Sequence, residues 1–185
     1  AWITANLGNI LSGQSFEVIY TPPNGTFLDK VDISADGSTI VGIYLDNGVS
    51  GNNVFVLKEG ELSFLKHTGG IWNIETSADG SALFAGTRDF WKDGEYSLLG
   101  SEQDVVMTLS ADGTTSAGVR RVYTPETGQI ITPFRIVEGE YQILEGIANG
   151  QNLRLAEEFQ VSGDGSIVAG YIVYGDDLNP TLTTF

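Results

Sequence analysis

The sequence predicts an all-β fold, a β-propeller-like ring of about four antiparallel blades with about four strands each. Three observations predict it: one turn motif recurs four times, a second motif alternates with it, and strand-like patterns flank both. Repeating units of ~40–50 residues have the size of a propeller blade. A ring of five blades with one degenerate blade, and a β-sandwich, are the alternatives.

The first motif is Ser-x-Asp-Gly-Ser/Thr, which begins at Ser34, Ser77, Ser110 and Ser162. Asp-Gly supplies the positive φ that tight hairpins need, so each copy predicts a turn between two strands. A glycine follows eight residues after the serine in three copies and nine residues after it in the second, where Gly86 suggests a β-bulge.

The residues around each turn have strand patterns. Before the first turn, Val31 and Ile33 alternate with Lys30 and Asp32, which is the period of a half-buried strand. After the turn, residues 39–45 are apolar or small almost throughout, which is typical of an inner strand covered on both faces. Similar patterns recur around the other three turns.

The second motif reads Gly-Glu-Leu/Tyr-Ser/Gln-apolar-Leu and begins at Gly60, Gly94 and Gly139. An aromatic residue precedes each copy: Phe55, Phe90 and Phe134. The motif predicts a third strand, whose aromatic side chain packs between blades, and a fourth strand after a glycine turn.

The two motifs divide a single domain, residues 1–185, into units at 27–66, 71–100, 104–146 and 156–185. The last unit lacks the second motif, and residues 1–11 could supply the missing strand. We therefore expect the N-terminal strand to close the last blade and the ring, which would protect the sheet edges.

Charge and composition exclude several functions. The formal net charge is −15, and the nine basic residues are scattered, which argues against binding nucleic acid or an anionic membrane surface. No apolar stretch approaches the ~18 residues of a membrane span. The absence of cysteine excludes disulfides, thiolate nucleophiles and cysteine-bound zinc. Because the chain begins at Ala1, we expect a processed product or a fragment.

The unit from Ile33 to Gly42, followed by an aromatic strand and a Gly-x-x-x-x-Leu ending, resembles the HAF repeats of bacterial extracellular proteins. The His-Ala-Phe tripeptide itself is absent, and only its phenylalanine is kept. The resemblance implies a repeat-built module that is secreted or displayed at the cell surface. It implies no established catalytic residues.

Two sets of acidic residues suggest calcium. The four motif aspartates, Asp36, Asp79, Asp112 and Asp164, either bind a hard cation or cap their own turns through Asx hydrogen bonds, and we favour the cap. Asp46 with Asn47, and Asp176 with Asp177, form loops that suit calcium better. No other cofactor is expected.

Ligand-binding candidates lie on the polar face of the first strands and near one basic segment. Asp32 and Glu75 could converge on a central channel, where paired carboxylates act as acid and base on a glycosidic bond. Trp72 could stack on a sugar ring. The remaining candidates, Arg120, Arg121 and Tyr123, form a basic and aromatic patch.

We favour a non-enzymatic extracellular module that serves as a scaffold, adhesin or ligand-binding domain, with a glycan or another surface protein as its partner. A glycan-active enzyme that uses the channel carboxylates is the first alternative. A self-assembling subunit of an extracellular fibre is the second.

Overall fold

The computed structural model of the chain describes residues 26–46, 52–65, 73–126, 128–144, 153–174 and 181–184. All the regular secondary structure in these ranges is β-strand, which confirms the all-β prediction. Within the same ranges, no helix has the length and apolar character that a membrane crossing requires.

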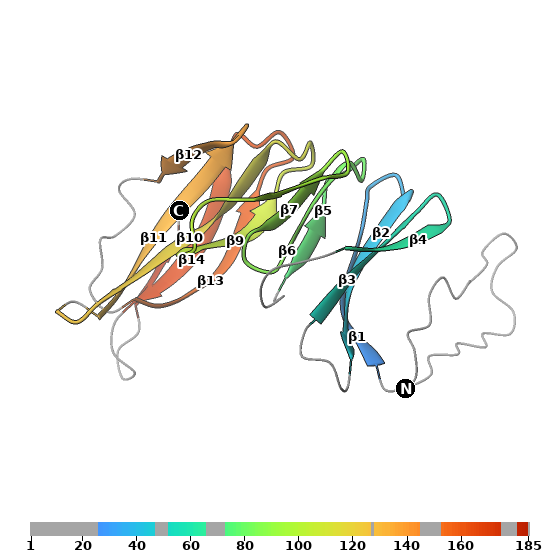
Figure 1. Ribbon diagram of the computed structural model, residues 1–185. Coiled ribbons are helices and arrows are strands. Elements are labelled where there is room, and N and C mark those ends of the chain that lie inside the picture. Colours follow the sequence, from blue (N-terminus) through green and yellow to red (C-terminus); the bar gives the residue numbers. More distant parts are fainter. Residues whose placement is uncertain are drawn as a thin grey trace, which may run out of the picture.

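The strands form four antiparallel sheets that follow one another along the chain, and we refer to them as blades 1 to 4 (Figure 1). Blade 1 consists of β1 (Thr26–Ile33), β2 (Thr39–Asp46), β3 (Asn52–Lys58) and β4 (Glu61–Leu65). Blade 2 consists of β5 (Ile74–Thr76), β6 (Ala82–Ala85), β7 (Asp89–Lys92) and β8 (Glu95–Leu98). Blade 3 consists of β9 (Asp104–Leu109), β10 (Thr115–Thr124), β11 (Gly128–Val137) and β12 (Glu140–Ile143). Blade 4 has three described strands: β13 (Leu153–Val161), β14 (Val168–Tyr174) and β15 (Thr181–Thr184).

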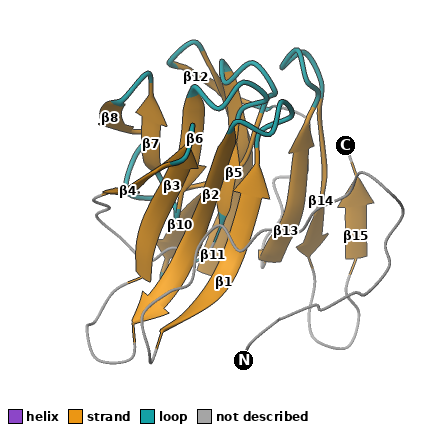
Figure 2. Cartoon of the chain, turned by 90° about the vertical axis from the view of Figure 1, so that its right-hand side faces the viewer, coloured by secondary structure: helices purple, strands orange, loops and turns teal. Residues whose placement is uncertain are grey.

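Each blade is a meander in which consecutive strands pair, as the sequence predicts. The blades stand side by side in a fan, and the Ser-x-Asp-Gly turns between their first and second strands lie at the same end (Figure 2). The first strand of each later blade packs on the blade before it, since β5 contacts β1 and β2, and β13 contacts β9, β10 and β11. We call the face that a blade turns to its predecessor its leading face, and the opposite face its trailing face.

The hydrophobic core lies between consecutive blades. Val41, Ile43 and Val54 on the trailing face of blade 1 pack with Ile74 and Trp91 on the leading face of blade 2. A second cluster joins blades 2 and 3, and a third joins blades 3 and 4. This arrangement explains why the second strands are apolar or small at nearly every residue: β6 and the first half of β10 are buried on both faces.

Two of the predicted aromatic residues take the expected place. Phe134 and Phe90 belong to the cluster between blades 2 and 3, so they pack between blades as predicted. Phe55 is also buried. Its ring lies over Gly42, where a Cβ atom would collide with it.

The four motif aspartates cap their own turns. Asp36 Oδ1 accepts hydrogen bonds from Ser34 Oγ at 2.7 Å and from Ser38 N and Oγ at 2.9 and 2.8 Å. The same bonds recur in the other three turns, at Asp79, Asp112 and Asp164. These donors lower the pKa of each carboxyl, to about 2 for Asp79 and Asp164. The turns therefore need no metal to satisfy the aspartates.

Two expectations about individual residues are wrong. Gly86 forms no bulge: it lies in the turn after β6, and Ala85 pairs with Ile74 in the way that Gly42 pairs with Val31. The alternation in β1 predicts that its apolar side is buried, but Val31 and Ile33 on that side are exposed on the leading face of blade 1. The predicted pairing of residues 1–11 with the last blade lies outside the described residues.

Candidate functional site

A cleft of about 630 Å³ lies where the first strands of all four blades approach one another. Lys30 comes from β1, Asn73 and Glu75 come from the edge of blade 2, and Val105 to Met107 come from β9. The remaining walls are residues 158–160 of β13, Arg121 of β10, and Gly86 and Thr87 of the turn after β6. Polar residues that alternation predicts on the first strands line this cleft, among them Lys30, Glu75 and Gln160, together with the apolar Val105 and Met107.

Glu75 is held at the wall of the cleft by the next blade. Its Oε2 accepts a hydrogen bond from the peptide N–H of Leu109 at 2.8 Å. Burial, with a smaller contribution from the Asp32 carboxylate, raises the pKa of Glu75 from 4.5 to about 7, although hydrogen bonds from Leu109 and Thr108 act in the opposite direction. Near neutral pH this carboxyl is therefore divided between its protonated and ionised forms.

Asp32 makes the corresponding contact one blade earlier. Its Oδ2 accepts a hydrogen bond from the peptide N–H of Thr76 at 2.8 Å. Asp32 and Glu75 thus lie at equivalent places, and each ties the first strand of its blade to the first strand of the next. Their recurrence in the sequence is explained by this link between blades.

Lys30, Asn73 and Arg121 give the cleft its hydrogen-bond donors. Lys30 Nζ donates to Asn73 Oδ1 at 3.2 Å, and Asn73 Nδ2 donates to the carbonyl of Met107 at 2.9 Å. The peptide N–H of Arg121 donates to the carbonyl of Gln103 at 2.8 Å. Its side-chain Nε is buried and has no hydrogen-bond partner within the described part of the chain. A buried guanidinium nitrogen without an acceptor is costly, so this atom is suited to a ligand oxygen.

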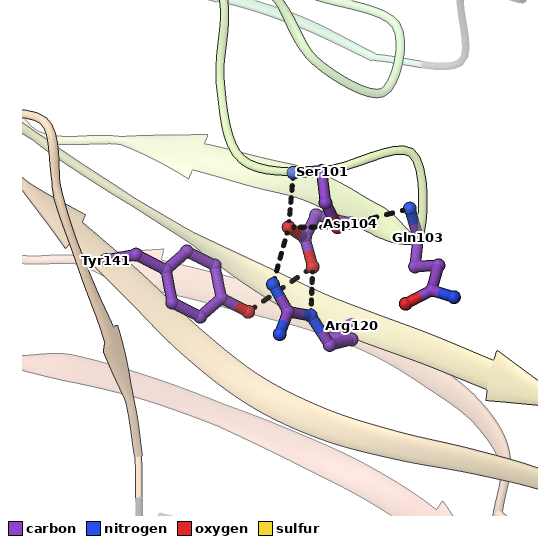
Figure 3. A network of polar contacts seen from close by, with 5 residues as sticks. All are labelled: Ser101, Gln103, Asp104, Arg120 and Tyr141. Carbon is purple, nitrogen blue, oxygen red and sulfur yellow. Dashed lines mark hydrogen bonds and ion pairs between the residues drawn. The ribbon is translucent and has the colours of Figure 1, made fainter.

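Arg120, the neighbour of Arg121, lies against Asp104 and Tyr141 (Figure 3). Its Nε and Nη2 contact Asp104 Oδ1 and Oδ2 at 2.8 and 3.1 Å, and its guanidinium lies 4.5 Å from the ring centre of Tyr141. Ser101 N and Oγ donate to Asp104 Oδ2 at 2.6 and 2.9 Å, and the Tyr141 hydroxyl donates to Oδ1 at 3.3 Å.

The charges in this cluster perturb one another. Burial alone raises the pKa of Asp104, but hydrogen bonds from Arg120 and Ser101 outweigh it and hold the pKa below its usual value. The hydrogen bond to Asp104 raises the pKa of Arg120. Burial and the charge of Asp104 raise the pKa of Tyr141. Both carboxyl oxygens of Asp104 accept hydrogen bonds from residues of blade 3 and of the turn before it, so the cluster is a structural one.

The structure separates the ligand-binding residues that the sequence suggests. Glu75 and Arg121 line the cleft, whereas Asp32 joins blades 1 and 2 and Arg120 belongs to the cluster in blade 3. Tyr123 is exposed near the end of β10. Trp72 lies outside the described residues.

The calcium candidates remain predictions. The side chain of Asp46 is not described, and Asn47, Asp176 and Asp177 lie outside the described residues. In the part of the chain that the structure describes, no group of three or more acidic or histidine side chains could hold a metal ion.

The sequence did not indicate two features of this site. The ion pair of Arg120 with Asp104 joins two strands whose residues are 16 apart, and it follows only from the register of β9 and β10. The sequence also grouped Arg120 with Arg121 in one patch, although alternation along β10 would have separated them, because adjacent residues of a strand point to opposite faces.

No known protein family and no curated protein matches the sequence. Solved structures do match. TolB from Acinetobacter baumannii is 19% identical with a TM-score of 0.56, over 91% of this chain and 42% of that one. Dipeptidyl peptidase 4 from Porphyromonas gingivalis is 10% identical with a TM-score of 0.57, over 84% of this chain and 32% of that one. A putative TolB from Agrobacterium tumefaciens is 14% identical with a TM-score of 0.52, over 91% of this chain and 60% of that one.

These likenesses show the fold. The chain has β-propeller architecture, as its repeats predict, with four successive blades in the described residues. It spans less than two thirds of the length of each of these three proteins.

Proposed function

We propose that the chain is a non-enzymatic β-propeller module, secreted or displayed at the cell surface, that binds an acidic glycan in the cleft. One observation carries the proposal: Arg121 lines the cleft, and its buried Nε has no hydrogen-bond acceptor among the described residues. A guanidinium binds a carboxylate through paired hydrogen bonds, so a sugar acid suits this position.

The other groups in the cleft fit a sugar. Lys30 adds a second positive charge, while Asn73 and Gln160 offer amide groups that can donate to and accept from hydroxyls. Apolar contacts come from Val105 and Met107. This mixture of apolar surface and a few convergent polar groups is typical of small-ligand sites.

The location and repeat class belong to the same proposal. The acidic, cysteine-free composition and the four Ser-x-Asp-Gly turns support an extracellular repeat module of the kind that HAF repeats form. Another surface protein is the alternative partner for the same site.

A panel of acidic and neutral oligosaccharides, followed by titration calorimetry of the hits, tests the proposal. Arg121→Met should weaken binding of acidic glycans at least tenfold, because it removes the charge and leaves a side chain of similar length. Arg135→Met is the matched control: Arg135 already donates to Gln142 at 2.9 Å, and it does not line the cleft. Absence of binding across the panel, or equal losses in the two variants, would refute the proposal.

One observation favours an enzyme as the second candidate. A carboxyl whose pKa is about 7, as for Glu75, is suited to proton transfer near neutral pH. Incubating the same glycans with the wild-type protein and Glu75→Gln would detect it as released reducing sugar that depends on Glu75. Binding without turnover would support the module and exclude the enzyme for those substrates.

A further inference from the structure

The cleft extends along β9, and Arg121 and Glu75 lie at different levels of it. The peptide N–H of Arg121 donates to the carbonyl of Gln103, the residue before β9. Glu75 Oε2 accepts from the peptide N–H of Leu109, the last residue of β9. Six residues at about 3.3 Å each, less the shortening at a register shift, place these two anchoring points roughly 16 to 20 Å apart along the strand. We therefore expect Arg121 and Glu75 to contact different sugar units of a bound glycan.

The other side-chain donors of the cleft lie between these two levels. Asn73 Nδ2 donates to the carbonyl of Met107, two residues before the end of β9, and Lys30 Nζ donates to Asn73 Oδ1. Positive charge and N–H donors are thus found on the Arg121 side of Glu75. The cleft has a chemically distinct end at each level.

The Glu75 level carries the negative charge of two neighbouring carboxyls. Asp32 accepts a hydrogen bond from the peptide N–H of Thr76, the residue after Glu75, and its charge contributes to the raised pKa of Glu75. Because burial brings that pKa to about 7, Glu75 is ionised in mildly alkaline solution and neutral in mildly acidic solution. A ligand hydroxyl can donate to the ionised carboxyl, whereas a ligand carboxylate is repelled by it.

The remaining charges around Glu75 do not cancel this effect. Among the described residues, Glu158 from β13, Lys30 from β1 and Arg121 from β10 are the other charged side chains that line the cleft. Lys30 and Glu158 are exposed, so solvent ions screen them. The first strand of the next blade offers Glu75 uncharged hydrogen-bond donors. What binds at this level therefore depends on the charge of Glu75 itself.

We propose that Glu75 is a specificity-determining residue, which makes the cleft select a glycan whose acidic unit at Arg121 is joined to a neutral unit at Glu75 over a run of acidic units. The inference rests on the proposed function, since it starts from an acidic glycan bound at Arg121. The neutral unit donates a hydroxyl to Glu75, and a second sugar acid at that place is rejected by like charge. The preference should therefore grow as the pH rises through the pKa of Glu75.

Two forms of one probe test this selection. The first is a trimer of glucuronic acid with every carboxyl free. The second is the same trimer methyl-esterified at all but one terminal carboxyl, prepared for either end. Sugar carboxyls that are free stay ionised between about pH 5.5 and about pH 8. In titration calorimetry, the wild type should bind the better esterified trimer about tenfold more tightly than the free trimer at about pH 8, and within about twofold at about pH 5.5.

Glu75→Gln should remove the preference at about pH 8, because glutamine is uncharged and its oxygen can still accept from the Leu109 N–H. Glu95→Gln, at an exposed position on β8, is the matched control and should keep the wild-type preference at both pH values. Arg121→Met should weaken both trimers by a similar factor. If Glu75 only held the blades together, its variant would weaken both trimers equally and leave their ratio unchanged. Near-UV circular dichroism shows whether each variant is folded.

The outcomes separate this inference from the proposed function. Absence of binding of every trimer would refute the proposed function and the inference with it. Equal affinity of the wild type for the free and esterified trimers at about pH 8 would overturn the inference alone. A preference that persists in Glu75→Gln, or that does not change between the two pH values, would also overturn it.

Discussion

Replacing Glu75 with glutamine should change how the stability of the protein depends on pH. The folded-state pKa of about 7 lies above the ordinary value of 4.5 because the carboxyl is buried. The unfolded chain therefore loses this proton at lower pH than the folded chain does. The contribution of Glu75 to stability is complete below about pH 4.5 and is lost as the pH rises through about 7.

The size of the effect follows from the two pKa values. At about 1.36 kcal/mol per pH unit, the difference between 4.5 and about 7 corresponds to about 3 kcal/mol of stability lost above the folded-state pKa. Glutamine has no charge to desolvate, and its side-chain oxygen can still accept the hydrogen bond from Leu109 N–H. As the pH rises from about 5 to about 8, the free energy of unfolding of the variant should therefore increase relative to that of the wild type by about 3 kcal/mol.

Urea unfolding of both proteins at several pH values provides the measurement. The difference between the two free energies of unfolding cancels the other titrating groups, which the proteins share. Glu95→Gln, at an exposed position on β8, is the matched control and should show no such trend. A wild-type-to-variant difference that stays flat between about pH 5 and pH 8 would refute the assignment of a buried, high-pKa carboxyl to position 75.

Three further changes test the packing. Arg120→Ala should lower the free energy of unfolding by about 3 to 5 kcal/mol, because it leaves the buried Asp104 carboxylate without its ionic partner; a loss below 1 kcal/mol in thermal or urea unfolding would contradict this. Gly113→Ala should cost about 1 to 3 kcal/mol more than Gly94→Ala, since both glycines have positive φ but only at Gly113 would the new Cβ meet another blade; equal losses in urea would contradict the contact. Asp79→Asn should cost stability near neutral pH and progressively less as the pH falls from about 4 to about 2, because the turn depresses the Asp79 pKa to about 2; acid titration of both proteins checks it.

The local chemistry of the repeat is what made the blades predictable. Ser-x-Asp-Gly closes a turn with its own side chains, as the bonds from Ser34 and Ser38 to Asp36 show, so the motif needs no distant partner. Alternation before the turn predicts the polar face of the first strands only in part, because Lys30 and Glu75 line the cleft but so do the apolar Val105 and Met107.

Burial on a given face was less predictable, because it depends on what stands beside the blade. Val31 and Ile74 occupy equivalent positions and have similar side chains, yet one is exposed and the other is buried. Both side chains fit an apolar strand face, so the sequence of a blade alone does not show which of them another segment covers. For the same reason, Arg120 could not be assigned to the Asp104 cluster before the register of β9 and β10 was known.

Glu75 both links two blades and lines the cleft, and the first role limits its use as a catalytic acid or base. One carboxyl oxygen is committed to the peptide N–H of Leu109 and so to the junction of blades 2 and 3. A general acid or base must move its proton at the substrate, and the second oxygen alone would remain for that step. A ligand that accepts a hydrogen bond from protonated Glu75 would stabilise the neutral form and relieve the cost of burying its charge. Ligand binding and blade packing would then favour the same protonation state, which suits a binding module better than a catalyst that must change state at every turnover.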